Sequence, residues 1–511
     1  MSILVRGKYL ITDARLEEKG ILNDCGVYID NDEITEIDDF CKLHDKYPHA
    51  KVVGNGKQLV MPGLIDAHTH GQGLSYFEEG FKYDYLENCI LEWALSRDTE
   101  LATMLNAVRH IQNGCTTTHH NDRGKPFDKD ALVKAKKKIE GYRSAGIRLA
   151  YSPAVKNINS VALEDKEFYK TLPSDMQEFV KPMIFIDHDK VVDDYLELFS
   201  SLYDTYNSKD LKIIFGPSWA QGSTDEFLLR IKEKSDELGG IPIHIHTLQT
   251  PIQKAFGLRN YGKSLLMHLN DLGLVDENLV LGHAVHLNED DISLLAEKNA
   301  STTHHPTCNF LMRNGISPVY YLLKQGVNVA LGIDGKGISD DEDIIMEMRM
   351  AFLLHRIPKY DLENAPTLTA FDIIKMATLN SARACGFDDI GAIKVGNKGD
   401  LILIDLERIT ENPWISPNLN IAEIFIHKAK GVDVNTVVIG GEVIMEDRKI
   451  LTIDVDSLYK EIRKDMNKGF SKEQLDYAAK MQLLKPYYQR WYRDWVDNDD
   501  FKPYYNLNNR K

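Results

Sequence analysis

The 511-residue chain has few cysteines, and none of its six lies in a Cys-x-x-Cys pair. Scattered thiols of this kind are typical of reduced cytoplasmic proteins and argue against a zinc ribbon or a disulfide framework. The chain also lacks a surplus of positive charge, because 77 acidic residues outnumber 61 basic ones and give a formal net charge of −16. Nucleic-acid binding depends largely on cationic contacts to phosphate, so we expect no nucleic-acid partner.

Long apolar runs are missing too, and none reaches the length that spans a bilayer, so we expect no membrane partner. The first residues carry Arg6 where a signal peptide needs an apolar region. What is present, 43% hydrophobic and 27% charged residues, is typical of a globular protein with a sizeable core. We therefore expect a cytoplasmic protein, long enough for more than one domain.

The middle of the chain alternates between helical patterns and short apolar runs over roughly three hundred residues, a length that fits a (β/α)8 barrel. Such alternation predicts a parallel sheet whose strands are connected by helices. No Gly-x-Gly-x-x-Gly sequence opens a helix after these runs, so a doubly wound open sheet is the second choice. The runs that predict strands include 147–151, 211–215, 241–246, 279–283 and 327–334.

The sequence patterns at both ends of the chain predict short strands. The first 60 residues or so hold several, but a region of this size cannot easily enclose a core of its own. Matching apolar runs occur at 399–405 and 436–444, and the second contains a Gly440-Gly441 hairpin signal. We therefore predict a small β-sandwich domain that is assembled from both ends of the chain.

The resulting division has three parts. The β-domain comprises residues 1–60 and 396–455, the α/β barrel of TIM type comprises residues 61–395, and a C-terminal extension comprises residues 456–511. The sequence of the extension predicts polar helices followed by an aromatic-rich tail. A tail of this kind more often packs on its own barrel or on a neighbouring subunit, and a lid over the substrate pocket is the alternative.

Histidines and an aspartate follow several of the predicted strands. His68 and His70 are two residues apart, so on a strand both imidazoles point to the same face. His246, His283 and Asp334 also end apolar runs. Reactive groups collect at the C-terminal ends of barrel strands, so we expect these side chains to lie close together.

Imidazoles and a carboxylate in one place predict a catalytic metal site. Three imidazoles and one carboxylate bind Zn or Fe and leave a position open for water. The metal lowers the pKa of that water to about 7, which makes hydroxide available at neutral pH. The chemistry implied is attack of hydroxide on an sp² carbon that bears a leaving group.

Several sequence motifs resemble those of the amidohydrolase superfamily, in particular its deaminase/chlorohydrolase branch, which includes triazine hydrolases and guanine and cytosine deaminases. The most specific motifs are Pro62-Gly63-Leu64-Ile65-Asp66-Ala67-His68-Thr69-His70, Leu281-Gly282-His283-Ala284-Val285-His286-Leu287, His305-Pro306-Thr307-Cys308-Asn309-Phe310 and Leu331-Gly332-Ile333-Asp334-Gly335. The resemblance extends from the opening strands to about residue 455. It implies a metal-dependent hydrolase built on a barrel.

The resemblance also implies roles for individual residues. It makes His68, His70, His246 and Asp334 the metal ligands, and it places His283 beside the hydrolytic water and a polar atom of the substrate. Members with two metals bridge them through a modified lysine at the end of the fourth strand. Here the lysine of that strand, Lys212, is at the wrong end, so we expect one ion, Zn or Fe.

One position departs from the deaminase pattern. Deaminases of this branch have a glutamate three residues after the fifth-strand histidine, where this chain has Gln249. An amide can orient a substrate, but it has no usable proton at neutral pH. Either His283 and Asp334 carry all proton transfer, or His286 or Asp122 substitutes, or hydrolysis is impaired.

Other residues are candidate substrate contacts. Gln72 resembles a substrate-contacting position of some purine deaminases, and Asn309 follows the predicted seventh strand. Trp219 could stack on a planar ring. His244 shares a strand face with His246 but lies deeper, so we predict a core histidine.

The leading hypothesis is a metal-dependent hydrolase that cleaves a non-peptide C–N bond of a small planar substrate. Among such reactions, deamination of an amino-heterocycle is the one we favour. Gln249 keeps amide, urea or carbamate hydrolysis open, as well as displacement of halide or alkylamine. A non-catalytic binding homologue is a further alternative. We also predict a homo-oligomer, because of the aromatic tail and the habit of the family.

Overall fold

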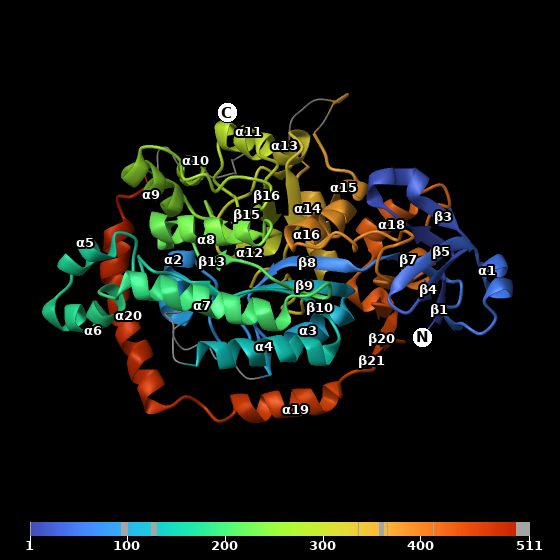
Figure 1. Ribbon diagram of the computed structural model, residues 1–511, viewed down its shortest axis with the longest axis horizontal. Helices are drawn as coiled ribbons and strands as arrows, with labels where there is room; N and C mark the ends of the chain where they lie inside the picture. The colour runs from blue at the N-terminus through green and yellow to red at the C-terminus, as the bar shows by residue number, and fades with distance from the viewer. Residues whose placement is uncertain are drawn as a thin grey trace.

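The computed structural model describes residues 2–93, 101–123, 130–335, 337–356, 362–364, 366–411 and 413–496. Helices surround a body of parallel strands at one end of the molecule, and a β-rich part occupies the other end, beside the N-terminus (Figure 1). Residues 497–511, the end of the predicted C-terminal extension, lie outside the described part of the chain.

Two four-stranded parallel sheets form the centre of the helical part. The first has the order β12-β10-β9-β8 and the second β14-β15-β16-β17. Isolated parallel bridges also join Phe215 to Ile243 and Thr69 to Asp334. The strands are β8 (Leu64–Thr69), β9 (Cys115–Asn121), β10 (Arg148–Ser152), β12 (Leu211–Ile213), β14 (Ile243–Thr247), β15 (Leu279–His283), β16 (Ser301–His304) and β17 (Asn328–Leu331).

Helices cover the outside of these strands. This covering explains why the strands carry apolar residues on both faces. Leu279, Val280 and Leu281 of β15 are successive residues, yet each is at most 2% exposed. The structure therefore confirms the predicted fold class, an α/β fold with parallel strands. The main covering helices are α3 (Ala102–Gln112), α4 (Ala131–Ala145), α7 (His188–Tyr206), α8 (Asp225–Glu237), α9 (Pro251–Tyr261), α10 (Leu265–Asp271), α11 (Glu289–Glu297), α14 (Ile344–Leu354), α15 (Ala370–Met376) and α16 (Leu379–Ala384).

Strands from both ends of the chain share one sheet in the β-rich part. Strand β18 (Leu401–Asp405) pairs with β7 (Gln58–Pro62) on one side and with β19 (Val434–Ile439) on the other. This sheet has the order β21-β20-β19-β18-β7-β2-β3, and a second sheet has the order β5-β4-β1-β6. The remaining bounds are β1 (Ser2–Arg6), β2 (Tyr9–Ile11), β3 (Ile21–Asn23), β4 (Cys25–Asp30), β5 (Glu33–Asp39), β6 (Lys51–Val53), β20 (Glu442–Glu446) and β21 (Lys449–Ile450).

The two sheets of this part contribute to a common apolar cluster, which includes Val5 and Val27 from one sheet and Leu403 from the other. A buried ion pair connects this part to the parallel strands, because Arg148 Nε of β10 lies 2.7 Å from Asp400 Oδ2. Packing joins the two parts as well, because one apolar cluster includes both Leu64 of β8 and Ile402 of β18.

The C-terminal extension forms two helices, α19 (Val455–Met466) and α20 (Lys472–Tyr492). They run along the outside of the molecule to the end far from the β-rich part (red in Figure 1). There α20 packs against α2 (Leu86–Glu92), where Lys485 Nζ lies 2.5 Å from Glu92 Oε1. Its end reaches another loop, because the Trp491 indole N–H donates to the Leu163 carbonyl (3.0 Å).

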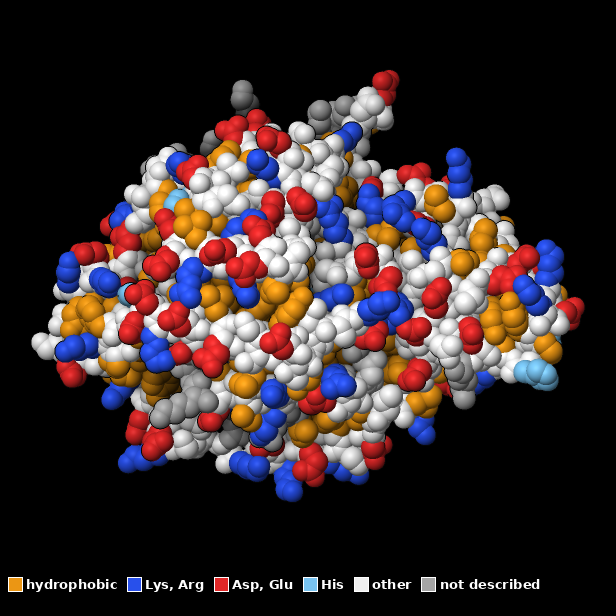
Figure 2. Space-filling model, viewed as in Figure 1, with side chains coloured by type: hydrophobic (Ala, Val, Ile, Leu, Met, Phe, Trp, Pro, Cys, Tyr) orange, Lys and Arg blue, Asp and Glu red, His pale blue; other side chains and the backbone are white. Residues whose placement is uncertain are grey.

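Among the described residues, no helix has both the length and the apolar character needed to cross a membrane. On the face seen in Figure 2, basic and acidic side chains are interspersed. Neither feature singles out a macromolecular partner for this face.

Candidate metal centre and its cavity

The predicted ligands come together at the C-terminal ends of the parallel strands. His70 Nε2 lies 3.2 Å from Asp334 Oδ1, and His283 Nε2 lies 3.4 Å from Asp334 Oδ2. One ring nitrogen each of His68, His70 and His246 falls within 4.8 Å of the others. We call His68, His70, His246, His283 and Asp334 the histidine cluster.

Backbone carbonyls hold the outer ring nitrogens of two of these histidines. His70 Nδ1 lies 2.8 Å from the Asn121 carbonyl, and His246 Nδ1 lies 2.6 Å from the Ser218 carbonyl. Because a carbonyl only accepts hydrogen bonds, Nδ1 carries the proton in both rings and Nε2 keeps its lone pair. Metal-binding histidines are usually oriented in this way.

His68 is held by another histidine instead. Its Nδ1 lies 2.7 Å from Nε2 of His244, which is fully buried. The prediction that His244 is a core histidine therefore missed a contact, because the side chain directly supports a candidate ligand. Nε2 of His68 and Nε2 of His283 are buried without a hydrogen-bond partner in the described part of the chain. Orphaned nitrogens that face a carboxylate fit a divalent cation.

His283 is oriented by Asn309. Its Nδ1 lies 3.0 Å from Asn309 Oδ1, an oxygen that also accepts from Asn314 Nδ2 at 3.2 Å. Nδ1 therefore donates, and Nε2 can accept a proton on the side of Asp334. Burial lowers the pKa of His283 and the charge of Asp334 opposes this, so the ring is neutral at neutral pH.

Asp334 is the ionised partner of the cluster. Burial alone would raise the pKa of its carboxyl, but the hydrogen bond to His70 and the nearby His283 hold that pKa well below its ordinary value. Its backbone has φ 65, and that of His283 has φ 71. Left-handed backbone at non-glycine residues is strained and collects at functional sites, as it does here at two strand ends.

A cavity of about 560 Å³ lies beside the histidine cluster. Gln249, which the sequence predicts as a catalytic residue, and Trp219, which it predicts as a substrate contact, both line it. Gln249 is only 4% exposed, and its backbone N–H donates to Gln253 Oε1 (2.8 Å). His70, His246, His283 and Asp334 of the histidine cluster also line it, and the remaining lining comprises Tyr76, Leu86, Ile90, Trp93, Asp122, Arg123, Lys156, Ser218, Cys308, Met312, Gly335, Tyr477 and Met481.

Asp122 lines the cavity, but its carboxylate is engaged elsewhere. Lys138 Nζ lies 2.7 Å from Oδ1, and the Tyr151 hydroxyl donates to Oδ2 at 2.6 Å. Although burial raises the pKa of Asp122, the charge of Lys138 and the hydrogen bond to His120 hold it well below the ordinary value. Because both of its oxygens are already bound, the Asp122 carboxylate is poorly placed to exchange a proton with a substrate.

Three predicted substrate contacts are not among the residues that line this cavity in the described chain. Asn309 lies behind His283 and orients it. His286 Nε2 bonds the Asn314 carbonyl at 2.8 Å. Gln72 is 3% exposed, and its side chain interacts with that of Tyr76, which does line the cavity.

Lys156 and Ser218 are among the lining residues that the sequence interpretation did not name. Lys156 is half-buried with Nζ 4.7 Å from the Trp219 ring centroid, and no described carboxylate lies within 4.0 Å of Nζ; burial lowers its pKa to about 8. The Ser218 hydroxyl is buried without a described hydrogen-bond partner. Their positions directly after strands could have identified both residues from the sequence. Lys156 follows the short β11 (Ala154–Val155), and Ser218 follows β13 (Gly216–Pro217).

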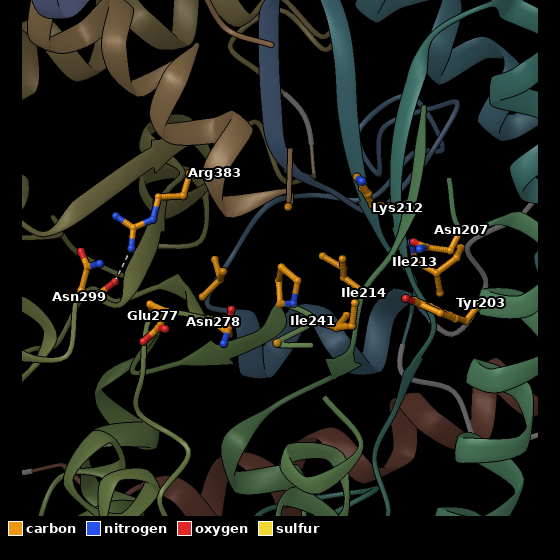
Figure 3. Close-up of a pocket in the computed structure, with 14 residues that line it drawn as sticks. Tyr203, Asn207, Lys212, Ile213, Ile214, Ile241, Glu277, Asn278, Asn299 and Arg383 are labelled. Atoms are coloured by element: carbon orange, nitrogen blue, oxygen red, sulfur yellow. Dashed lines mark hydrogen bonds between the residues drawn. The ribbon is translucent and has the colours of Figure 1, made fainter. Parts of the chain in front are cut away.

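A second cavity, of about 540 Å³, lies at the other ends of the strands (Figure 3). It is lined by residues that begin or precede strands, such as Pro242 before β14 and Asn278 before β15. Lys212 also lines it, which places this lysine away from the histidine cluster, as its position in the strand predicted.

Comparison with known proteins identifies the family. The model of the amidohydrolase family matches residues 59–444. This chain belongs to the amidohydrolase family. It is therefore a hydrolase of a metal-dependent family that acts on non-peptide C–N bonds, as the sequence predicted.

Relatives of this amidohydrolase match along most of their length. A 5-methylthioadenosine/S-adenosylhomocysteine deaminase of Caldanaerobacter subterraneus subsp. tengcongensis is 31% identical over 91% of this chain and 98% of its own. A 5'-deoxyadenosine deaminase of Methanosarcina acetivorans is 27% identical over 90% of this chain and 96% of its own.

Solved structures share the fold. An adenosine deaminase from Xanthomonas campestris with bound zinc superimposes with a TM-score of 0.75 at 23% identity, over 91% of this chain and 99% of that one. The atrazine chlorohydrolase of Arthrobacter aurescens, complexed with zinc, gives a TM-score of 0.74 at 20% identity, over 91% of this chain and 100% of that one. At these identities the likeness concerns the fold.

Proposed function

We propose that this amidohydrolase deaminates a small amino-substituted heterocycle and uses a single divalent ion, preferably zinc. The observation that carries the proposal is the histidine cluster, in which nitrogens of His68, His70 and His246 approach one another beside Asp334. The named activities of the relatives, which are deaminases of adenosine derivatives, support an aminated ring as substrate. Lys212, the lysine of the fourth strand, lies at the opposite cavity, which supports one ion rather than two.

The same proposal includes the finer architecture. The eight parallel strands would close into a (β/α)8 barrel of residues 61–395, which the two bridges between the sheets support. The barrel would be inserted into a composite β-sandwich domain of residues 1–60 and 396–455, which the pairing of β7 with β18 supports. The homo-oligomer and the cytoplasmic location stay predictions.

A divalent ion held by His68, His70, His246 and Asp334 would supply hydroxide at neutral pH by lowering the pKa of water. Asp334, as a carboxylate, accepts the proton that the water loses when its oxygen bonds the ring carbon. His283 Nε2 lies 3.4 Å from Asp334 Oδ2 and is free to accept or share that proton. The C–N bond then breaks, and the proton leaves with the amine as ammonia.

Gln249 orients the substrate in this scheme. Its amide can donate to and accept from polar atoms of the ring, while His283 and Asp334 carry the protons. A glutamate at the same place would add a second proton carrier, and general acid–base catalysis contributes on the order of a hundredfold or more to rate.

The test is ammonia release by the zinc-loaded protein from a panel of aminated purines, pyrimidines and triazines. We expect turnover by the parent, and an increase in kcat on the order of a hundredfold in Gln249→Glu for amines that leave poorly. His286→Gln, at a residue outside the cavity lining, is the matched control and should behave like the parent. Absence of ammonia from both the parent and Gln249→Glu overturns the proposal.

Gln249 also favours a second candidate function, hydrolysis of a substrate whose leaving group needs no proton, such as a halide. Chloride release from a chlorinated triazine, measured beside ammonia release from the aminated triazine, separates the two functions. A parent that releases chloride but no ammonia is a halide hydrolase, and Gln249→Glu should then leave the rate of chloride release nearly unchanged.

A further inference from the structure

One side of the cavity is formed by two helices that are far apart in the sequence. Helix α2 and the residue after it contribute one set of side chains, and helix α20 of the C-terminal extension contributes the other. We call this side the outer wall, which consists of Leu86, Ile90, Trp93, Tyr477 and Met481. Only the indole N–H of Trp93 and the hydroxyl of Tyr477 are polar, so the outer wall is mostly hydrocarbon and aromatic surface.

Specific contacts hold α20 in this place. Gln482 Nε2 donates to the Leu91 carbonyl (3.3 Å), next to the ion pair of Lys485 with Glu92. At the far end of α20, the Leu163 backbone N–H donates to the Tyr492 hydroxyl (2.7 Å). The helix is therefore attached along the part that follows the cavity-facing stretch, from Gln482 to its end at Tyr492.

The side chains of α20 differ sharply by face. Met481 lines the cavity and is 9% exposed, and Leu484 is fully buried. Leu483, two residues after Met481, is 59% exposed. This contrast offers a matched pair of positions on one helix, one in the cavity and one in solvent.

The rest of the lining is more polar. Asp122, Lys156, Ser218 and Gln249 all line the cavity and come from loops that follow the parallel strands. A ligand in this cavity thus has polar partners near the strand ends and apolar partners at α2 and α20. Planar rings with apolar substituents match such a division, because apolar surface gains from burial while polar atoms need partners.

We propose that α20 is part of the substrate site, and that the outer wall selects a planar heterocycle that carries an apolar substituent on the side away from the reacting carbon. Met481 is the specificity-determining residue that α20 contributes. That the substrate is a planar heterocycle rests on the proposed function. That its substituent is apolar rests only on the residues of the outer wall. A lid of this kind was the alternative that the sequence left open for the extension.

The experiment measures binding of purine and 9-benzylpurine to the zinc-loaded full chain by calorimetry. Neither ligand has an amino group to lose, so binding is read without turnover. We expect the parent to bind 9-benzylpurine at least tenfold more tightly than purine. Met481→Gln keeps the side-chain length but makes it polar, and it should lower this ratio at least threefold while purine affinity changes less than twofold.

Leu483→Gln is the matched control and should keep the ratio of the parent. Met481→Leu, which stays apolar, should keep it as well, so a loss confined to Met481→Gln is not a folding defect. A parent without preference for the benzyl ligand, or equal ratios in Met481→Gln and Leu483→Gln, overturns the inference.

Ammonia release from adenine and 9-benzyladenine separates this inference from the proposed function. A benzyl preference in binding without any ammonia release supports the outer wall and contradicts deamination. Ammonia release without a benzyl preference in binding supports deamination and contradicts the outer wall.

Discussion

The histidine cluster and the outer wall of the cavity are built in different ways. His68, His246, His283 and Asp334 are at most 5% exposed, and each histidine ring of the cluster has a partner at its outer nitrogen. The outer wall consists of side chains from two helices that a few hydrogen bonds and one ion pair attach. In the proposed scheme the chemistry would depend on the strand ends, and the selectivity would depend on added helices that can change without disturbing them.

The largest effect should come from removing a ligand in the histidine cluster. His246→Ala is expected to reduce activity at least about a thousandfold and to abolish stoichiometric zinc binding, because three imidazoles and one carboxylate complete the site. Zinc content by mass spectrometry checks this. His286→Ala, a histidine that binds a carbonyl outside the cavity, should keep its zinc; equal zinc in both variants would contradict the assigned ligands.

A smaller effect should come from the support of His68. His244→Leu removes the acceptor that lies 2.7 Å from His68 Nδ1, and loss of such a partner weakens metal binding by about 10–100-fold. A competing chelator measures the zinc affinity. His244→Gln can still accept a hydrogen bond and should recover part of the affinity. An unchanged affinity in His244→Leu would show that the cluster is less interdependent than its geometry implies.

A substitution of Lys156 tests the polar side of the cavity through its effect on the stability of the fold. Burial lowers its pKa to about 8, so the folded protein disfavours the ammonium. The penalty is full below pH 8 and disappears as the pH approaches the ordinary lysine pKa of about 10.4, where the unfolded chain also loses its proton. Lys156→Met should therefore stabilise the fold by roughly 1–3 kcal/mol at pH 7 and by less at pH 10.

Melting temperatures at the two pH values check this prediction, with Lys138→Met as the control. Lys138 lies 2.7 Å from Asp122, so its removal leaves a buried carboxylate without its charge partner and should lower the melting temperature at pH 7. A destabilised Lys156→Met at pH 7 would mean that the contacts of the ammonium with the Trp219 ring and the Ser160 carbonyl outweigh the cost of its burial.

The smallest effect should come from the attachment of α20. Tyr492→Phe removes the hydroxyl that accepts from the Leu163 N–H, a bond worth about 1 kcal/mol. Proteolysis and hydrogen exchange of α20 should increase, while zinc affinity stays that of the parent. A parallel loss of zinc would show that the outer wall and the histidine cluster are coupled rather than separable.

Much of the site was readable in the sequence because its signals are local. His68 and His70 share a strand face, and His246, His283 and Asp334 each end an apolar run, so strand geometry and parallel arrangement bring them together. The pairing of the two chain ends followed from a similar argument, since the first strands lacked a core of their own.

Tertiary structure decided the rest. Asn309 lies behind His283 rather than in the cavity, and His244 reaches His68 across strands; neither contact has a signature in sequence spacing. The position of α20 against α2 depends on packing between segments almost 400 residues apart, as the bond from Gln482 to Leu91 shows. The sequence alone therefore determined which residues form the histidine cluster, because strand periodicity is local. Only long-range packing determined the outer wall, because it is made by helices that the chain brings together from its two halves.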